Sequence, residues 1–255
     1  MNSIDIFKKI FNFFNDDTPY YAASLSFFTI FSLLPLLALL IVVISTLPIF
    51  AQYVDSIMLY ILDFINPIHF SSLTSSIESF LINTNKLGNI GILYLFFVFS
   101  MFFKDYEYII NKIYNTPSRA VYKLFFMYLG FLILIPTLFF IFIFISTLTK
   151  LSFPIHIFTF IFIWIMFIIL FTLSANTKVS IIASSFSSLI TLIVLSATKS
   201  LFGYYVIANT TYATIYGSFS VVLFFFLWIY ISWSIYLYGT KLCSIINKGN
   251  SKYDH

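Results

Sequence analysis

The sequence predicts an all-α, polytopic integral membrane protein with six transmembrane helices. The chain has 255 residues, of which 61% are hydrophobic and only 9% are charged. Several of its apolar runs extend over about 20 residues, the length that a helix needs to cross a bilayer. A soluble domain carries about 25% charged residues, which form the polar shell around its core. The composition excludes such a domain, and the 22% aromatic residues exclude a disordered chain.

The apolar runs place the six membrane-spanning helices in order along the chain. Backbone groups inside a bilayer must find hydrogen-bond partners within their own segment, so each run is expected to be helical. The second helix should continue past its apolar run towards Ile113, and Pro35 and Pro136 should kink the first and third helices. The predicted spans are 22–47, 90–103, 124–148, 155–174, 179–201 and 215–242.

The placement of the basic residues predicts the orientation of these helices. Lysine and arginine accumulate on the cytoplasmic side of membrane proteins. With the N-terminus inside, three basic residues lie outside, namely Lys86, Lys150 and Lys199. The other ten lie inside, namely Lys8, Lys9, Lys104, Lys112, Arg119, Lys123, Lys178, Lys241, Lys248 and Lys252. We therefore expect both termini in the cytoplasm. The first apolar run exceeds the length of a cleavable signal and is expected to remain as a span.

Three segments outside the spans complete a single membrane domain over residues 1–255. Residues 1–20 carry apolar side chains at helical spacing beside Lys8 and Lys9, which is typical of an interfacial helix on the cytoplasmic surface. Residues 51–87 contain two amphipathic patterns separated by a proline and are expected to form an external helical pair. Residues 243–255 are expected to be a cytoplasmic tail.

The fifth predicted helix carries a row of hydroxyl side chains on one face. At 100° per residue, the spacing brings together Ser184, Ser187, Ser188 and Thr191. Two interpretations follow: small residues that allow close helix packing, or the polar wall of a substrate path. Lys199 lies at the predicted external end of this helix. It either extends to the lipid headgroups or meets an anionic headgroup of a substrate.

Polar residues also gather at the cytoplasmic end of the second helix. Glu107 and Asn111 are four residues apart and share a helix face. Asp105 is expected to pair with one of the basic residues Lys104, Lys112 or Arg119. This cluster is either a helix end with interfacial ion pairs or a cytoplasmic gate.

A tight polar turn separates the fourth and fifth helices. Asn176 or Thr177 in this turn is expected to cap the fifth helix, because both residue types accept hydrogen bonds from a helix N-terminus.

The sequence offers no recognisable catalytic centre. Cys243 is the only cysteine and the three histidines are widely separated, so a cysteine-based metal site and a histidine cluster are excluded. Neither a phosphate-binding Walker loop nor a G-x-S-x-G motif occurs. We therefore predict no catalytic residues, no metal and no cofactor.

Several segments resemble the YihY/BrkB family of bacterial inner-membrane proteins, formerly called the ribonuclease BN family. The opening helix AASLSFFTIFSLLPLL is similar to that of the family. In EYIINKIY, the residues Glu107, Asn111, Ile113 and Tyr114 match a Glu-x-x-x-Asn-Arg-Ile-aromatic signature, with Lys112 in place of arginine. The segments ANTKVS with Asn176, TKSLFGYYV, and YATIYGSFS with Tyr216 and Gly217 match further family motifs. The resemblance extends from Asp17 to Leu242.

Two positions depart from the family pattern. Ala175 replaces a proline that often precedes the turn asparagine, and Lys241 replaces the acid of a Gly-Ala-Glu ending. The second departure removes any role that this acid has in other members.

The resemblance implies six membrane helices with both ends in the cytoplasm of a bacterial inner membrane. It also implies transport, export or translocation of a lipid, an amphiphile or a small solute, and a link to virulence. The alternatives are a membrane-associated ribonuclease in tRNA processing, which is the older label of the family, and a non-catalytic scaffold of the envelope. The expected partners are membrane lipids and other copies of the chain, and nucleic acid is not expected.

Overall fold

The computed structural model describes five helices that confirm the all-α prediction for the part of the chain it covers. It describes residues 13–45, 75, 79, 88–120, 122–124, 126–131, 134, 137–138, 141, 155–208, 216 and 219–250. The helices are α2 (Thr18–Ser45), α5 (Gly88–Tyr114), α7 (Ile155–Ser174), α8 (Ile181–Ala208) and α10 (Phe219–Asn250). The described residues between 122 and 141 are also helical.

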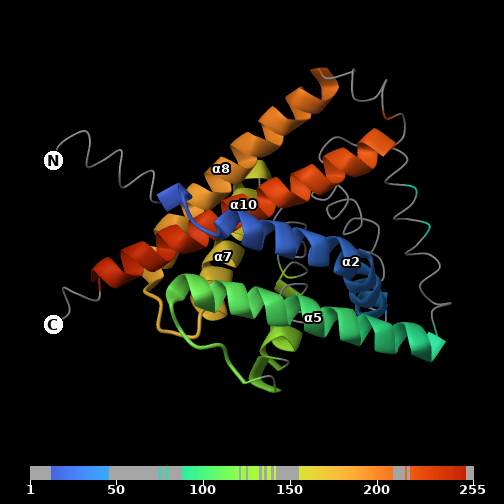
Figure 1. Ribbon diagram of the computed structural model, residues 1–255, viewed down its shortest axis with the longest axis horizontal. Helices are drawn as coiled ribbons and strands as arrows, with labels where there is room; N and C mark the ends of the chain where they lie inside the picture. The colour runs from blue at the N-terminus through green and yellow to red at the C-terminus, as the bar shows by residue number, and fades with distance from the viewer. Residues whose placement is uncertain are drawn as a thin grey trace.

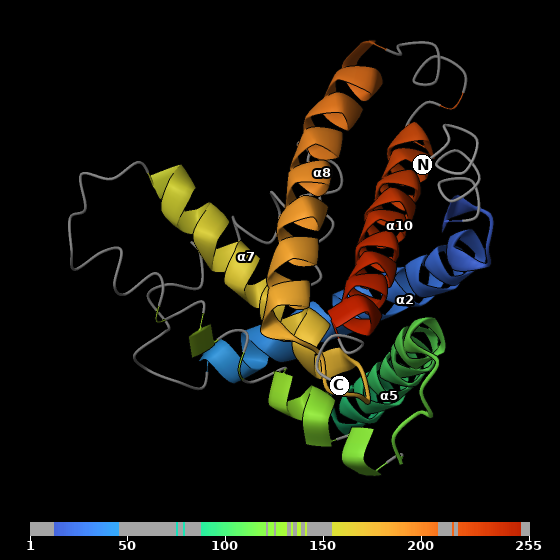
Figure 2. The same ribbon diagram turned by 90° about the vertical axis from the view of Figure 1, so that its left-hand side faces the viewer.

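The helices converge at one end of the molecule and diverge towards the other (Figure 1). We call the convergent end the junction end. There the last residues of α5, α7 and α10 meet the first residues of α8. Helix α10 packs along α8 and against α2, and α2 in turn packs against α5. Helix α7 packs against α8 and leaves the junction end in a different direction (Figure 2).

Among the residues that the structure describes, two helices are long and apolar enough to cross a membrane. They are α8, over Ile181–Ala208, and Val222–Gly249 within α10. Each has 28 residues, and at a rise of 1.5 Å per residue each is about 42 Å long. This exceeds the hydrocarbon thickness of about 30 Å, so each helix is long enough to cross a bilayer core.

The observed helix bounds agree closely with the predicted spans for α7 and α5. Helix α7 covers Ile155–Ser174, the predicted range. Helix α5 runs without interruption through its apolar part and its polar end to Tyr114, as expected for a continuous helix. It ends there because Asn115 adopts a left-handed conformation with φ 57°, which is a common way to terminate a helix.

The first helix begins earlier than predicted, at Thr18 rather than at residue 22. The cause is Asp16, whose Oδ1 accepts a hydrogen bond from the Thr18 backbone N–H at 3.1 Å and whose Oδ2 accepts one from Thr18 Oγ1 at 2.8 Å. These bonds cap the helix start. Residues 13–14 are helical and residues 15–17 form a bend, so the predicted interfacial segment 1–20 is interrupted here.

The sixth predicted span and the tail after it need correction. Helix α10 continues to Asn250, and Cys243 and Ser244 are buried. Residues 243–250 therefore continue α10, and the small side chains of Cys243 and Ser244 pack against neighbouring helices. The fifth helix, α8, also extends beyond its predicted end, to Ala208.

Some predictions fall on residues outside the described part of the chain. These are most of the external pair at 51–87, where only Ser75 and Ser79 are described and both are helical, and much of the third span at 124–148.

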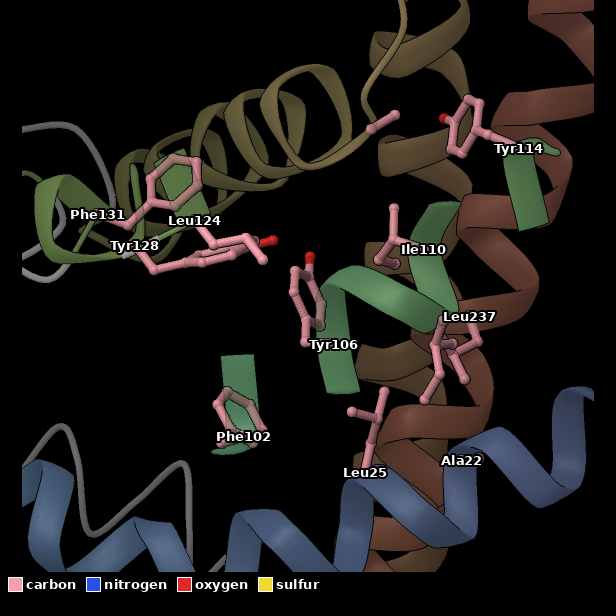
Figure 3. Close-up of a cluster of buried hydrophobic side chains, with 12 residues drawn as sticks. Ala22, Leu25, Phe102, Tyr106, Ile110, Tyr114, Leu124, Tyr128, Phe131 and Leu237 are labelled. Carbon is pink, nitrogen blue, oxygen red and sulfur yellow. The ribbon is translucent and has the colours of Figure 1, made fainter. Parts of the chain in front are cut away.

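A buried apolar cluster of described residues joins α2, α5, α10 and the helical residues 122–124 and 126–131 (Figure 3). Leu25 of α2, Ile110 of α5 and Leu237 of α10 are among its almost fully buried members. Tyr106 and Tyr128 belong to the same cluster and carry hydroxyl groups into it. A buried tyrosine hydroxyl needs a hydrogen-bond partner, so the apolar cluster leads directly to a polar network.

Candidate functional site

The centre of the polar network is Glu107, whose side chain is fully buried on α5. Its Oε2 lies 3.0 Å from Arg119 Nη1 and accepts a hydrogen bond from the Tyr128 hydroxyl at 2.7 Å. Its Oε1 accepts a bond from the Arg119 backbone N–H at 3.1 Å. A buried carboxylate is tolerated only when it is paired and hydrogen-bonded, and both conditions hold here.

Arg119 connects this carboxylate to the end of α7. Its Nη1 donates to the carbonyl of Ser174 at 2.8 Å, and its Nη2 donates to the carbonyls of Leu173 at 3.0 Å and Ala175 at 2.5 Å. The last carbonyls of a helix lack partners within the helix and carry partial negative charge. The guanidinium group of Arg119 therefore links the end of α7 to the Glu107 carboxylate of α5.

The ion pair that was predicted for Asp105 is not the observed one. Arg119 pairs with Glu107, and Asp105 instead accepts a hydrogen bond from the Ser24 hydroxyl of α2 at 3.2 Å. The reason is the helix face: Asp105 and Glu107 are two positions apart on α5, so their side chains point in different directions from the helix.

Asn111 fixes the turn between α7 and α8. Its Oδ1 accepts hydrogen bonds from the Asn176 backbone N–H at 2.7 Å and from Thr116 Oγ1 at 2.8 Å. The Asn176 side chain donates to the carbonyl of Pro117 at 2.8 Å. The structure thus brings together three of the family-motif residues, Glu107, Asn111 and Asn176, at one end of the bundle.

The predicted cap of α8 by Asn176 or Thr177 is wrong. Helix α8 begins at Ile181, and the backbone N–H of Ser180 donates to Oδ1 of Asn247 in α10 at 2.8 Å. Asn176 lies too far before the helix start to cap it, and its backbone and side chain are both used in contacts with α5 and the loop that follows α5.

Three tyrosines extend the network, and sequence reasoning missed all of them. Besides Tyr128, the hydroxyl of Tyr106 lies 2.8 Å from Ser174 Oγ and 2.5 Å from the hydroxyl of Tyr236 in α10. Within long apolar runs these tyrosines look like ordinary membrane-helix residues. The sequence feature that could have indicated them is the hydroxyl group of each tyrosine, because a buried tyrosine hydroxyl requires a hydrogen-bond partner.

The hydroxyl face of α8 lies in a packed interface. Ser184, Ser187 and Ser188 have no exposed surface, and Thr191 is only 2% exposed. A Cβ atom added to Gly239 of α10 would overlap the Thr191 hydroxyl and lie 3.0 Å from its Cγ2. Helices α8 and α10 thus approach so closely at this point that only glycine fits.

Most of these hydroxyls bond to the backbone of α8 itself. Ser188 donates to the carbonyl of Ser185 at 3.0 Å, and Thr191 donates to the carbonyl of Ser187 at 2.7 Å. Ser184 bonds to carbonyls of the preceding turn and also accepts a bond from Thr172 of α7 at 3.0 Å.

Ser187 and the only cysteine lie together between α8 and α10. The Ser187 and Tyr114 hydroxyls are buried, have no hydrogen-bond partner among the described residues, and lie near the side chain of Cys243. Cys243 is fully buried, so the interpretation as an inert packed thiol fits the structure.

Lys199 lies far from the network. It is partly exposed on α8, 18 positions beyond Ile181 and therefore about 27 Å along the helix axis. Tyr216 is 47% exposed, and Gly217 lies outside the described residues. Within the part of the chain that the structure describes, no three histidine, cysteine or acidic side chains are grouped so that they could hold a metal ion.

A second polar contact joins the start of α2 to α10. Lys241 Nζ lies 2.7 Å from Asp16 Oδ2, bonds to the carbonyl of Phe13, and lies 4.7 Å from the centre of the Phe13 ring. Partial burial raises the pKa of Asp16, but the hydrogen bonds from Lys241 and Thr18 outweigh it, and the pKa lies below the ordinary value of 3.8. Lys241 therefore has a structural partner at the position where the family pattern has an acid.

Comparison with known proteins identifies the family. Residues 10–255 match the family model for virulence factor BrkB. The chain belongs to the virulence factor BrkB family. This result confirms the resemblance, and one of the motifs on which the resemblance rests contains Glu107 and Asn111 of the network.

BrkB-family relatives support the membrane assignment. The chain is 28% identical over 242 residues to a UPF0761 membrane protein of Legionella pneumophila, covering 91% of this chain and 59% of the relative. It is 26% identical over 246 residues to a UPF0761 membrane protein of Actinobacillus pleuropneumoniae, covering 91% and 89%. A third such protein, from Pseudomonas paraeruginosa, is 28% identical over 245 residues, covering 90% and 59%.

These comparisons show that the chain is a helical membrane protein of the BrkB family. It spans about 59% of the length of several of the relatives it matches, including those from Legionella and Pseudomonas. No solved structure matches the chain.

Proposed function

We propose that this BrkB-family chain is a multi-pass protein of the bacterial inner membrane that translocates a lipid or another amphiphile. In this proposal the chain crosses the membrane six times, and the junction end and both termini lie in the cytoplasm. Residues 51–87 lie outside.

The distribution of the described basic residues supports this orientation. Lys112 and Lys248 lie in the last turns of α5 and α10. Arg119 lies in the loop after α5 and Lys178 in the turn before α8, whereas Lys199 lies towards the other end of α8. An excess of lysine and arginine marks the cytoplasmic side of a membrane protein.

The hydroxyl face of α8 is the observation that carries the transport proposal. Ser188 and Thr191 satisfy their hydroxyls with carbonyls of α8 itself. Moving α8 away from α10 would break neither bond. The polar face can therefore be uncovered to water at little cost in hydrogen bonding, unlike a helix face held by bonds to its neighbour.

The two ends of the helix bundle differ in how firmly their helices are held together. At the junction end, Glu107 and Arg119 tie α5, α7 and the following turn together through buried charged groups. Towards the other end the helices diverge (Figure 1). In the proposed cycle the contacts between α5 and the end of α7 stay fixed while α8 moves away from α10, and the uncovered hydroxyls form a polar path for a headgroup. Lys199 would attract an anionic headgroup near the outer end of this path.

A reversible crosslink between α8 and α10 tests the proposal. Because Ser187 lies beside the native Cys243, the substitution Ser187→Cys places two thiols at the contact between the helices. The variant is reconstituted in liposomes that contain a fluorescent phospholipid, and the lipid that reaches the other leaflet is measured before and after oxidation. The proposal predicts that oxidation stops the translocation and that a reductant restores it.

Two controls make this result specific. Wild-type protein has Cys243 alone, and the double variant Ser187→Cys/Cys243→Ser has the introduced thiol alone, so neither can form the crosslink within one chain. Translocation that continues at the same rate in the fully crosslinked variant would refute the proposed motion of α8. Wild-type protein that translocates neither phospholipids nor other amphiphiles would refute the transport function itself.

A further inference from the structure

The turn before α8 and the last turn of α10 bring two lysines together at the junction end. The side chain of Asn247 accepts a hydrogen bond from the Ser180 N–H at 2.8 Å and donates one to the carbonyl of Lys178 at 3.1 Å. Lys248 follows Asn247 directly in the chain. One asparagine thus fixes the backbones of Lys178 and Lys248 beside each other, where α8 and α10 meet in both views (Figures 1 and 2).

Both lysines are exposed, and the described acidic residues are used elsewhere. Glu107 is buried against Arg119, Asp16 is bonded to Lys241, and Asp105 accepts a bond from Ser24. The fourth, Asp17, interacts with Tyr21 at the start of α2. Neither Lys178 nor Lys248 forms an ion pair with a described carboxylate. Their positive charges are therefore available to an anionic ligand.

Exposed apolar side chains lie close to these lysines in the sequence, in the first turn of α8 and the last turns of α10. Ile181 and Ile182, in the first turn of α8, are 70% and 73% exposed. Ile245 of α10 is 52% exposed and lies three residues before Lys248, on the same side of the helix. A soluble phosphate compound would need only the lysines. Positive charges that border an apolar surface match the headgroup and the acyl chains of a phospholipid.

We propose that Lys178 and Lys248 form a binding site for an anionic phospholipid. The lipid phosphate lies between the two ammonium groups, and its acyl chains lie against Ile181, Ile182 and Ile245. Basic sites between membrane helices at the cytoplasmic surface bind anionic headgroups, and each lysine near such a surface contributes about 1 kcal/mol. The site is separate from the hydroxyl face of α8, so it does not depend on the transport proposal.

Native mass spectrometry of the full chain in detergent tests this site. The protein is titrated with phosphatidylglycerol and, separately, with phosphatidylcholine of the same acyl chains. Wild-type protein is expected to prefer phosphatidylglycerol. The double variant Lys178→Gln/Lys248→Gln should bind it about 10- to 30-fold more weakly, as two lost lysine contributions imply. Its affinity for phosphatidylcholine should not change.

Matched variants and a competitor define the outcomes. Lys104→Gln/Lys123→Gln removes two exposed charges elsewhere and should keep the preference, and Lys178→Arg/Lys248→Arg should also keep it. An equal loss in the Lys104/Lys123 variant would show general charge attraction and overturn the site. Displacement of the lipid by equimolar inorganic phosphate would overturn the assignment to a phospholipid, because acyl-chain contacts would then contribute nothing.

Discussion

Glu107 and Arg119 form a salt bridge of 3.0 Å, in which none of the glutamate side chain and 16% of the arginine side chain is exposed. The two residues are 12 positions apart, one on α5 and the other in the loop that follows it. Through Arg119 the bridge also reaches three carbonyls at the end of α7. Stability at the junction end should therefore depend strongly on this pair.

Arg119→Ala should destabilise the protein by about 3–5 kcal/mol, because it leaves a buried carboxylate without its cation. Tyr128→Phe removes only one of the donors to Glu107 and should cost about 1.5 kcal/mol. Thermal unfolding in detergent compares both variants with the wild type. If Arg119→Ala unfolds at the wild-type temperature, the bridge does not hold the junction end.

Gly239→Ala should destabilise the contact between α8 and α10 by about 1–3 kcal/mol, because the added methyl group overlaps Thr191. Gly203→Ala is the matched control, since nothing lies within 4 Å of its added Cβ. This control should be neutral or slightly stabilising, because alanine favours a helix over glycine.

A second substitution tests the origin of the Gly239 effect. Thr191→Ala removes the hydroxyl and methyl groups that the new Cβ would meet, so it should restore part of the stability of Gly239→Ala. Unfolding measurements on the two single variants and the double variant give the coupling. If the losses of stability in the two single variants simply add in the double variant, contact with the Thr191 side chain is not the reason that position 239 requires glycine.

Asp16→Asn should weaken the contact between the start of α2 and α10 without removing the helix cap, because asparagine caps helices as well as aspartate does. The folded-state pKa of Asp16 lies below 3.8, so its stabilising effect is present above about pH 4 and is lost as the pH falls through the lower, folded-state value.

The unfolding temperatures of wild type and Asp16→Asn should therefore differ at pH 7, and the difference should disappear once the pH falls below the folded-state pKa of Asp16. In a Lys241→Met background the same substitution should have no further effect at pH 7. A difference that persists at low pH, or in the Lys241→Met background, would assign the effect to something other than the ion pair.

Local sequence patterns predicted the helices well, and contacts between distant segments account for the failures. The bounds of α7 follow from one apolar run, and the length of α5 follows from its continuous helical pattern. The partner of Arg119 could not be predicted, because the loop that carries it could reach several carboxylates. Similarly, Asn247 caps α8 from another helix, 67 residues further along the chain. Such a contact leaves no periodic signal.

The hydroxyl face of α8 shows the same limit at the candidate site. The spacing of Ser184, Ser188 and Thr191 predicted one shared face, and the structure places all three in a buried interface. The sequence left close packing and a polar path open as two interpretations, because both require the same residues. The structure shows the packed arrangement, and the proposed function adds that this face becomes uncovered during transport.

The most direct measurement of this claim is the aqueous accessibility of position 188 in working protein. Ser188→Cys is prepared in a Cys243→Ser background, reconstituted in liposomes and treated with a membrane-impermeant maleimide during lipid translocation. Phe186→Cys, at a 55% exposed position on the same helix, is the lipid-facing control. The account predicts labelling at position 188 and little at 186. An unlabelled cysteine at 188 in protein that still translocates lipid would contradict it.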